Sequence, residues 1–296
     1  MKIASMSASK ILSQKIKVAL VQLSGSSPDK MANLQRAATF IERAMKEQPD
    51  TKLVVLPECF NSPYSTDQFR KYSEVINPKE PSTSVQFLSN LANKFKIILV
   101  GGTIPELDPK TDKIYNTSII FNEDGKLIDK HRKVHLFDVD IPNGISFHES
   151  ETLSPGEKST TIDTKYGKFG VGICYDMRFP ELAMLSARKG AFAMIYPSAF
   201  NTVTGPLHWH LLARSRAVDN QVYVMLCSPA RNLQSSYHAY GHSIVVDPRG
   251  KIVAEAGEGE EIIYAELDPE VIESFRQAVP LTKQRRFDVY SDVNAH

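Results

Sequence analysis

The stretch GKFGVGICYDMRFPE, residues 167–181, decides the class of fold. Its apolar first half predicts a strand over residues 169–173, which leads directly into Cys174. Proline is typical of the first turn of a helix, because the N–H that proline lacks would have no partner within the helix there. Pro180 therefore predicts a helix over residues 180–189. Strands that alternate with helices are typical of α/β proteins. We therefore expect an α/β fold around this segment.

The sequence before this stretch alternates in the same way. Apolar runs and helical periodicity predict the order strand, helix, strand, helix, strand over residues 16–23, 29–45, 53–56, 85–95 and 96–101. The tetrapeptide NEDG at residues 122–125 then signals a hairpin between strands at residues 115–121 and 126–131. Antiparallel pairing therefore enters in the middle of the chain.

The sequence after the stretch continues with further elements. We predict a strand at residues 193–196, a helix at 207–219, and strands at 222–226, 242–246, 251–254 and 262–266. No change in composition marks a linker. We therefore predict one mixed α/β domain in which helices cover the sheets.

The charge of the chain is balanced. Lysine and arginine total 35 residues against 34 aspartates and glutamates, so no charge excess would draw the protein to nucleic acid or to an anionic membrane surface. No stretch approaches the roughly 18 consecutive apolar residues of a membrane-spanning helix. We expect neither a nucleic-acid partner nor a membrane partner.

The cysteines and histidines do not have the spacing of a metal site. Cys59, Cys174 and Cys227 lie far apart, with no CxxC and no Cys/His cluster. His208 and His210 are two residues apart on a predicted helix and cannot share one of its faces. We expect no metal, a reducing compartment such as the cytoplasm, and inert buried thiols at Cys59 and Cys227.

The N-terminal tract has a distinct composition. The first 17 residues are basic, rich in serine and free of acidic residues, which mitochondrial transit peptides share. We favour a short flexible arm over residues 1–15, because the tract is brief and contains no arginine. A mitochondrial location is the alternative.

Three tracts contain residues that can do chemistry. Glu58 follows a buried strand, where an ionised carboxylate needs a raised pKa or a nearby cation. Lys133 ends the basic run at residues 130–133, and Lys130 and Arg132 are expected to face solvent. The predicted strand-to-helix turn at Cys174 resembles a nucleophile elbow. In such a turn the side chain of the nucleophile is exposed, and backbone N–H groups point at an incoming oxyanion. Taken singly, each residue has an ordinary alternative: an exposed acid, a solvated base or a buried inert thiol.

The three tracts, in this order, resemble the signatures of the carbon-nitrogen hydrolase (nitrilase-like) superfamily. Further tracts are similar to the family at residues 196–201, 205–209, 214–224, 241–243 and 246–250. Within it, the tracts at residues 59–64, 135–142, 147–156 and 218–224 most resemble the Nit proteins and their ω-amidase branch. The resemblance runs over nearly the whole chain, so we expect residues 16–296 to form a single domain of this family.

The resemblance implies a fold and a set of roles. The fold would be a four-layer α-β-β-α sandwich that pairs its helical face with a second subunit in a homodimer, with no metal or organic cofactor. Glu58 would be the general base, Lys133 the cation of the transition state, Cys174 the nucleophile and Glu149 a supporting carboxylate. The backbone N–H of Tyr175 would join Lys133 in holding the oxyanion.

The resemblance also implies a substrate class. ω-Amides of 2-oxo dicarboxylates, such as 2-oxoglutaramate and 2-oxosuccinamate, would be hydrolysed to the dicarboxylate and ammonia. The candidates for the substrate pocket are Tyr64, Arg178, Phe200 and Asn201, and Arg178 either binds the substrate carboxylate or belongs to a structural ion pair. The alternatives are a deaminated-glutathione amidase, another carbon-nitrogen hydrolase such as a carbamoylase, and a catalytically silent binding protein.

Overall fold

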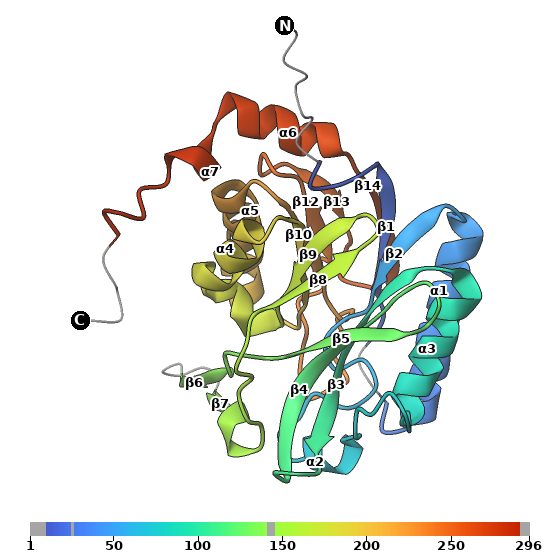
Figure 1. Cartoon of the computed structure of the whole chain (residues 1–296). Coiled ribbons are helices and arrows are strands. Elements are labelled where there is room, and N and C mark those ends of the chain that lie inside the picture. Colours follow the sequence, from blue (N-terminus) through green and yellow to red (C-terminus); the bar gives the residue numbers. More distant parts are fainter. Residues whose placement is uncertain (1–9, 25–26, 141–145, 291–296) are drawn as a thin grey trace, which may run out of the picture.

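The computed structural model describes residues 10–24, 27–140 and 146–290, and two six-stranded sheets lie at its centre (Figure 1). The first sheet has the order β14-β1-β2-β3-β4-β5. Strands β1, β2 and β3 run parallel, whereas β14, β4 and β5 pair antiparallel with their neighbours. The bounds are β1 Ile16–Gln22, β2 Thr51–Val55, β3 Ile98–Asp108, β4 Lys113–Phe121, β5 Leu127–Arg132 and β14 Glu261–Leu267.

The second sheet is built in a similar way from the later part of the chain. Its order is β13-β12-β11-β10-β9-β8, with β9, β10 and β11 parallel and the other pairs antiparallel. The bounds are β8 Thr160–Thr164, β9 Gly167–Val171, β10 Ala191–Pro197, β11 Tyr223–Cys227, β12 Ile244–Val246 and β13 Ile252–Glu255.

The two sheets pack face to face. Leu53 and Val55 of β2 join a hydrophobic core that also contains Ile195 of β10, so this core lies between the sheets. Val54 and Met194 point to the opposite faces of their strands and belong to two separate outer cores. Both faces of each sheet are therefore buried, because successive side chains of a strand alternate in direction.

Helices cover the two outer faces, as Figure 1 shows. Helices α1 (Lys30–Glu47) and α3 (Thr83–Phe95) pack on the first sheet, and α4 (Pro180–Arg188) and α5 (Thr204–Asn220) pack on the second. Asp29 starts α1 by accepting a hydrogen bond from the N–H of Ala32. The predicted α/β class and the four-layer α-β-β-α sandwich are confirmed.

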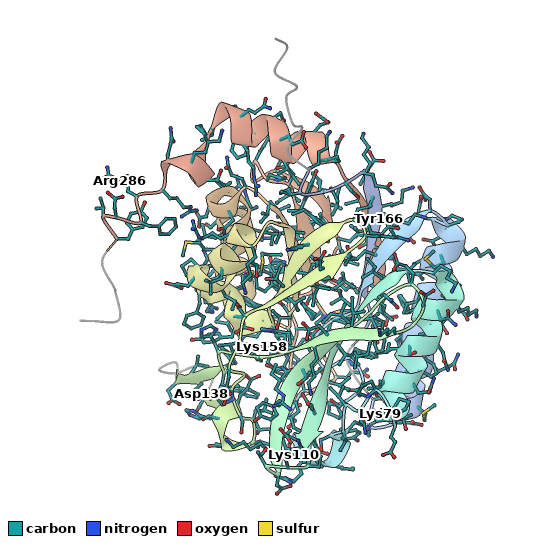
Figure 2. The ribbon with its side chains drawn as sticks, viewed as in Figure 1. Lys79, Lys110, Asp138, Lys158, Tyr166 and Arg286 are labelled. Atoms are coloured by element: carbon teal, nitrogen blue, oxygen red, sulfur yellow. The ribbon has the colours of Figure 1, made fainter. Side chains whose placement is uncertain are left out.

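Several elements were not predicted from the sequence. Besides β8, they are α2 (Phe69–Tyr72), the small hairpin of β6 (Asp138–Asp140) and β7 (Ser146–His148), the 3₁₀ helices η1 (Glu149–Glu151) and η2 (Cys174–Arg178), α6 (Pro269–Ala278) and α7 (Leu281–Gln284). Strand β3 is longer than predicted, because it continues past Gly101 and pairs with β4 as far as Asp108. The lysines labelled in Figure 2 at positions 79, 110 and 158 are exposed at the surface.

The chain before β1 contacts the second sheet. Leu12 is fully buried and forms a backbone bridge with Gly167, and the N–H of Ser13 donates to the carbonyl of Tyr166. The expected flexible arm covers residues 1–15, of which residues 1–9 lie outside the described part. None of the helices in the described ranges is long and apolar enough to cross a bilayer.

Candidate active site

The ends of strands from both sheets bring the predicted residues together. Glu58 follows β2 and Lys133 follows β5 in the first sheet, whereas Cys174 follows β9 in the second. All three side chains are buried, and the charges of Glu58 and Lys133 both act on the Cys174 thiol. Residues more than 100 positions apart in the sequence therefore share one site at the edge of the sandwich.

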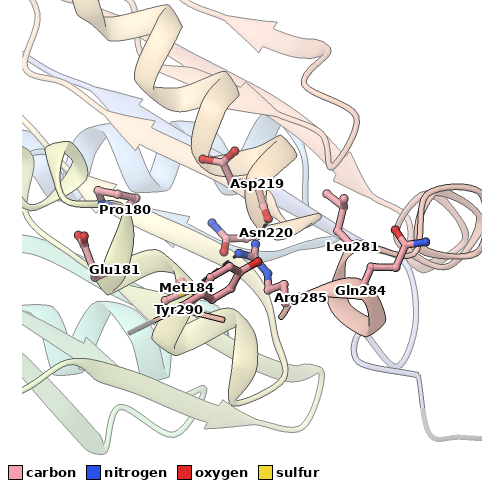
Figure 3. Close-up of a pocket in the computed structure, with 9 residues that line it drawn as sticks. All are labelled: Pro180, Glu181, Met184, Asp219, Asn220, Leu281, Gln284, Arg285 and Tyr290. Carbon is pink, nitrogen blue, oxygen red and sulfur yellow. Dashed lines mark hydrogen bonds between the residues drawn. The ribbon is translucent and has the colours of Figure 1, made fainter. Parts of the chain in front are cut away.

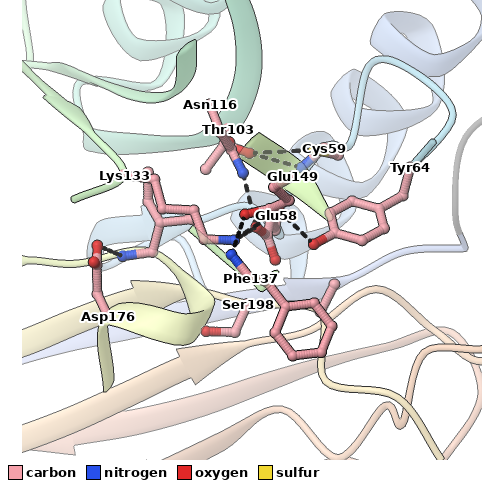
Figure 4. Close-up of polar contacts among 12 residues, drawn as sticks. Glu58, Cys59, Tyr64, Thr103, Asn116, Lys133, Phe137, Glu149, Asp176 and Ser198 are labelled. Carbon is pink, nitrogen blue, oxygen red and sulfur yellow. Dashed lines mark hydrogen bonds and ion pairs between the residues drawn. The ribbon is translucent and has the colours of Figure 1, made fainter. Parts of the chain in front are cut away.

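The Lys133 ammonium lies between two carboxylates (Figure 4). Its Nζ donates to Glu149 Oε1 at 2.8 Å and to Glu58 Oε1 at 3.2 Å. Glu149 is held in turn, because it accepts from the Tyr64 hydroxyl at 2.9 Å and from the Phe137 N–H at 2.8 Å. The four predicted residues Glu58, Lys133, Glu149 and Cys174 are thus brought together, and Tyr64 supports Glu149.

The two carboxylates keep Lys133 charged. Burial by itself lowers the pKa of this lysine, but the charges of Glu149 and Glu58 outweigh burial and hold the pKa well above its usual value. Burial raises the pKa of Glu58, Lys133 opposes that shift, and Glu149 adds to it. The net pKa of Glu58 is raised, which suits a group that must both take and return a proton near neutral pH.

Cys174 occupies a strained turn. Its φ is 45°, in the left-handed region that a residue other than glycine rarely adopts. Such a conformation costs of order 1–3 kcal/mol and is concentrated at functional sites. The predicted strand-to-helix turn is therefore present, with the 3₁₀ helix η2 between β9 and α4.

The expectation that the turn would expose the thiol is wrong. Cys174 is only 5% exposed, and burial together with the charge of Glu58 raises its pKa well above the usual value. The thiol is covered because Phe137, Phe200 and Tyr237 line the space beside it, whose volume is about 10 Å³. That volume holds about one water molecule. The space beside the thiol, as it stands in this structure, is therefore smaller than an amide substrate.

Three of the four pocket candidates line this space. Arg178, Phe200 and Asn201 border it together with Cys174, whereas Tyr64 borders a neighbouring cavity of about 70 Å³ that reaches Glu58. Asn201 also has a structural role, because its Oδ1 accepts from the N–H groups of residues 203 and 204 at the start of α5. Its Nδ2 is buried without a partner among the described residues and is free to bind a ligand.

Arg178 has no carboxylate partner in the described part of the chain. Its Nη1 lies 3.2 Å from His208 Nδ1, and its guanidinium lies over the rings of Phe200 and Tyr175 at 4.9 and 5.5 Å. Its Nε is buried and unpartnered. The structural ion pair that sequence reasoning left open for Arg178 is therefore not found among these residues.

Sequence reasoning missed Asn116 and Tyr237. Asn116 Nδ2 donates to Glu58 Oε1 at 2.8 Å, and the Tyr237 hydroxyl donates to the carbonyl of Ala199. The sequence did contain a signal for Asn116, because an asparagine buried inside the apolar strand β4 needs hydrogen-bond partners. Tyr237 carried no such signal, because it lies in an irregular segment between β11 and β12.

The remaining candidates have structural roles. Lys130 and Arg132 are only partly exposed and pair with the buried Glu106, so the expectation that they face solvent is wrong. Cys59 and Cys227 are buried, and burial raises the pKa of both thiols, as expected for inert cysteines. No group of three metal-ligating side chains occurs within residues 10–24, 27–140 and 146–290.

A larger cavity lies away from this centre (Figure 3). Its volume is about 530 Å³, and it is bordered by α4, the end of α5 and the segment from Leu281 to Tyr290. The described residues that border it include no cysteine, serine, histidine or lysine. Among the described residues that border it, there is therefore no thiol or aliphatic hydroxyl of the kind that attacks an amide, although Arg285 supplies a cation.

Comparison with known proteins agrees with this geometry. The family model for carbon-nitrogen hydrolase matches residues 17–277. The chain belongs to the carbon-nitrogen hydrolase family. It is thus a hydrolase that acts on carbon–nitrogen bonds, and its active-site tracts lie within the matched region.

Individual relatives in the carbon-nitrogen hydrolase family are similar over nearly their whole length. A hydrolase of Schizosaccharomyces pombe is 53% identical over 98% of this chain and 89% of its own. The omega-amidase NIT2 of Homo sapiens is 50% identical over 93% of this chain and 96% of its own. The crystal structure of Saccharomyces cerevisiae Nit3, described as a member of branch 10 of the nitrilase superfamily, has a TM-score of 0.89 and 96% identity, and covers 95% of this chain and 100% of its own.

Proposed function

We propose that the protein is an ω-amidase, which hydrolyses the terminal amide of 2-oxo dicarboxylate monoamides to the dicarboxylate and ammonia. The observation that carries the proposal is that Cys174 and Arg178 border one cavity, while the charges of the Glu58–Lys133–Glu149 cluster act on the Cys174 thiol. Arg178 has no carboxylate partner in the described residues. The relatives named omega-amidase, 50–52% identical to this chain, support the same activity.

The first half of the reaction forms a thioester. Cys174 Sγ attacks the amide carbon while its proton passes to Glu58, whose Oε2 has no hydrogen-bond partner among the described residues. The negative oxygen of the tetrahedral intermediate is stabilised by Lys133 and by the backbone N–H of Tyr175. Glu58 then gives the proton to the amide nitrogen, the carbon–nitrogen bond breaks, and ammonia leaves.

The second half hydrolyses the thioester. Glu58 takes a proton from water while the water oxygen attacks the thioester carbon, and the carbon–sulfur bond breaks. The thiolate then recovers the proton from Glu58, which restores the starting state. One carboxylate serves both halves, and its raised pKa fits both proton transfers.

Arg178 is proposed to bind the carboxylate at the far end of the substrate. It borders the same cavity as Cys174 and lies four residues further along the chain, at the end of η2. A guanidinium binds a carboxylate through two parallel hydrogen bonds, which gives orientation as well as affinity. Once the side chains that close this cavity have moved, a substrate of five carbons would contact Arg178 at one end and Cys174 at the other.

Arg178→Met is expected to lower kcat/KM for 2-oxoglutaramate roughly 10- to 150-fold, since a charge-assisted contact contributes about 1.5–3 kcal/mol. A neutral amide of similar size should be hydrolysed nearly as fast as by the wild type. Steady-state ammonia release and a melting curve measure both effects. Arg188→Met, on the exposed end of α4, is the matched control. Equal losses on both substrates, or a large drop in Tm, would assign Arg178 to structure.

A panel of amides tests the substrate class itself. Ammonia release is compared for 2-oxoglutaramate, 2-oxosuccinamate, deaminated glutathione and an N-carbamoyl amino acid. The highest kcat/KM on the first two supports the proposal. A preference for deaminated glutathione or for the carbamoyl compound would move the protein to a different substrate branch while leaving the thioester mechanism in place.

The proposal includes a homodimer formed through the helical face. Leu207 and Leu211 lie one turn apart on α5 and are 66% and 61% exposed, and Leu185 of α4 is exposed as well. Exposed apolar side chains of this size favour burial against a partner. We place this dimer in the cytoplasm, with the mitochondrion as the alternative.

The dimer is tested by substitution on α5. The wild type is expected to have twice the mass of the chain in light scattering, and the double variant Leu207→Asp with Leu211→Asp is expected to be monomeric. Leu233→Asp, which changes an exposed leucine of an irregular segment, should leave the mass unchanged. A wild-type protein that is monomeric at micromolar concentration would contradict the proposal.

A further inference from the structure

Asp176 is a fully buried carboxylate that accepts four hydrogen bonds from three residues in two segments of the chain. Its Oδ2 accepts from the Ile173 N–H at 2.9 Å and from His131 Nε2 at 3.1 Å. Its Oδ1 accepts from the N–H of His135 at 2.9 Å and from His135 Nδ1 at 2.7 Å. Both oxygens are therefore fully occupied, and the hydrogen bonds from the two histidines lower the pKa of Asp176 despite its burial.

The residues that Asp176 contacts flank the two reacting groups. His131 and His135 lie two residues before and two residues after Lys133, and Ile173 immediately precedes Cys174. Asp176 itself lies in η2, two residues after Cys174 (Figure 4). One carboxylate thus links the segment that carries the ammonium to the turn that carries the thiol, and these segments belong to different sheets.

We infer that Asp176 is a positioning residue that fixes the separation of Cys174 and Lys133. The inference rests on the roles proposed above for these two residues, and Asp176 itself does not border the cavity beside the thiol. Catalysis depends on this separation, because Lys133 must meet the oxyanion that forms when the thiol attacks. A misplacement of about 1 Å can cost roughly 100-fold in rate.

Asparagine cannot replace Asp176 without a displacement. Each oxygen of Asp176 accepts one backbone N–H, from Ile173 on one side and from His135 on the other. The amide of asparagine has one oxygen and one NH₂ group, so in either orientation its NH₂ faces a backbone donor. A buried donor without an acceptor is costly, and one of the two segments must move.

Asp176→Asn is therefore expected to lower kcat for 2-oxoglutaramate about 30-fold, with KM changed less than about threefold. Asp247→Asn is the matched control, because Asp247 is also buried but accepts the N–H groups of Arg249 and Lys251 through Oδ1 alone. The control should retain wild-type kinetics, since an amide oxygen can accept both hydrogen bonds.

A pair of variants at His135 tests the same inference if Asp176→Asn does not fold. His135→Asn keeps a donor at the position of Nδ1, and His135→Phe removes the donor but keeps a ring to stack on Phe179. We expect kcat within about threefold of the wild type for the first and about tenfold lower for the second, at unchanged KM.

Three outcomes would overturn the inference: equal kcat for the two His135 variants, equal losses for Asp176→Asn and Asp247→Asn, or a loss confined to KM. Each is read on protein whose folded fraction is measured by its melting curve. Failure of the proposed function would look different, since the wild type itself would then hydrolyse 2-oxoglutaramate more slowly than another amide of the panel.

Discussion

Cys174→Ala is expected to fold as the wild type does and to release no measurable ammonia from 2-oxoglutaramate. The reason is chemical, because no other group in the described cavity can form the thioester. Alanine removes one buried sulfur from a residue with a φ of 45°, a backbone conformation that the native chain already holds without glycine. Ammonia release under substrate excess and a melting curve make the comparison.

Cys227→Ala is the control for this prediction. Its thiol is fully buried in the core between the sheets and donates toward the carbonyls of Val21 and Val55. It should keep wild-type turnover. In the wild type, iodoacetamide should label the peptide of Cys174 well before those of Cys59 and Cys227, because the proposed base Glu58 lies beside the Cys174 thiol and can take its proton as the reagent reacts. Turnover by Cys174→Ala, or equal labelling of all three cysteines, contradicts the assignment.

Glu58→Gln is expected to lower kcat at least about 100-fold, the usual contribution of a positioned general base. Glutamine keeps an oxygen for the hydrogen bonds from Asn116 and Lys133, so the fold of the site is retained. It cannot carry a proton between the thiol, the leaving ammonia and water. Steady-state kinetics give kcat, and mass spectrometry of quenched enzyme shows whether any thioester forms.

The pH dependence gives a second measurement of the same role. Glu58 acts as a base when it is deprotonated, so activity falls as the pH drops through its pKa. Burial raises this pKa, and the acidic fall in kcat/KM should therefore lie above the range of an ordinary glutamate. Glu74→Gln, a buried glutamate paired with Lys30 and Ser84, should leave the profile unchanged. A near-wild-type rate for Glu58→Gln would place the base elsewhere.

Much of the fold could be predicted because both sheets have parallel strands buried on both faces. Such strands are short apolar runs separated by amphipathic helices, as at Leu53 to Val55 before α3 and at Phe192 to Ile195 before α5. Strand β8, with the sequence TTIDT, lies at the edge of its sheet and has no such run. Helix α6 did carry signals, namely Asp268 as N-cap and Pro269 in the first turn.

Sequence patterns could identify site residues only where these follow predicted strands, whereas Glu149 was predicted from the family resemblance alone. Glu58, Lys133 and Cys174 follow directly on predicted strands, and the structure brings all three into one site. The burial of Cys174 could not be predicted, because the residues that cover it come from distant irregular segments, above all Tyr237. The same is true of Asp176, whose partners His131 and His135 are near in space but more than 40 residues away in the sequence.

Strand β14 has a consequence for how the protein is made. It completes the first sheet beside β1, although the ribosome synthesises it after every strand of the second sheet. Until residues 261–267 have left the ribosome, β1 is an open sheet edge, and an open edge favours pairing with other chains. We therefore expect a nascent chain to gain activity only after residues 261–267 have left the ribosome. Prematurely terminated chains should be inactive and depend on chaperones or degradation.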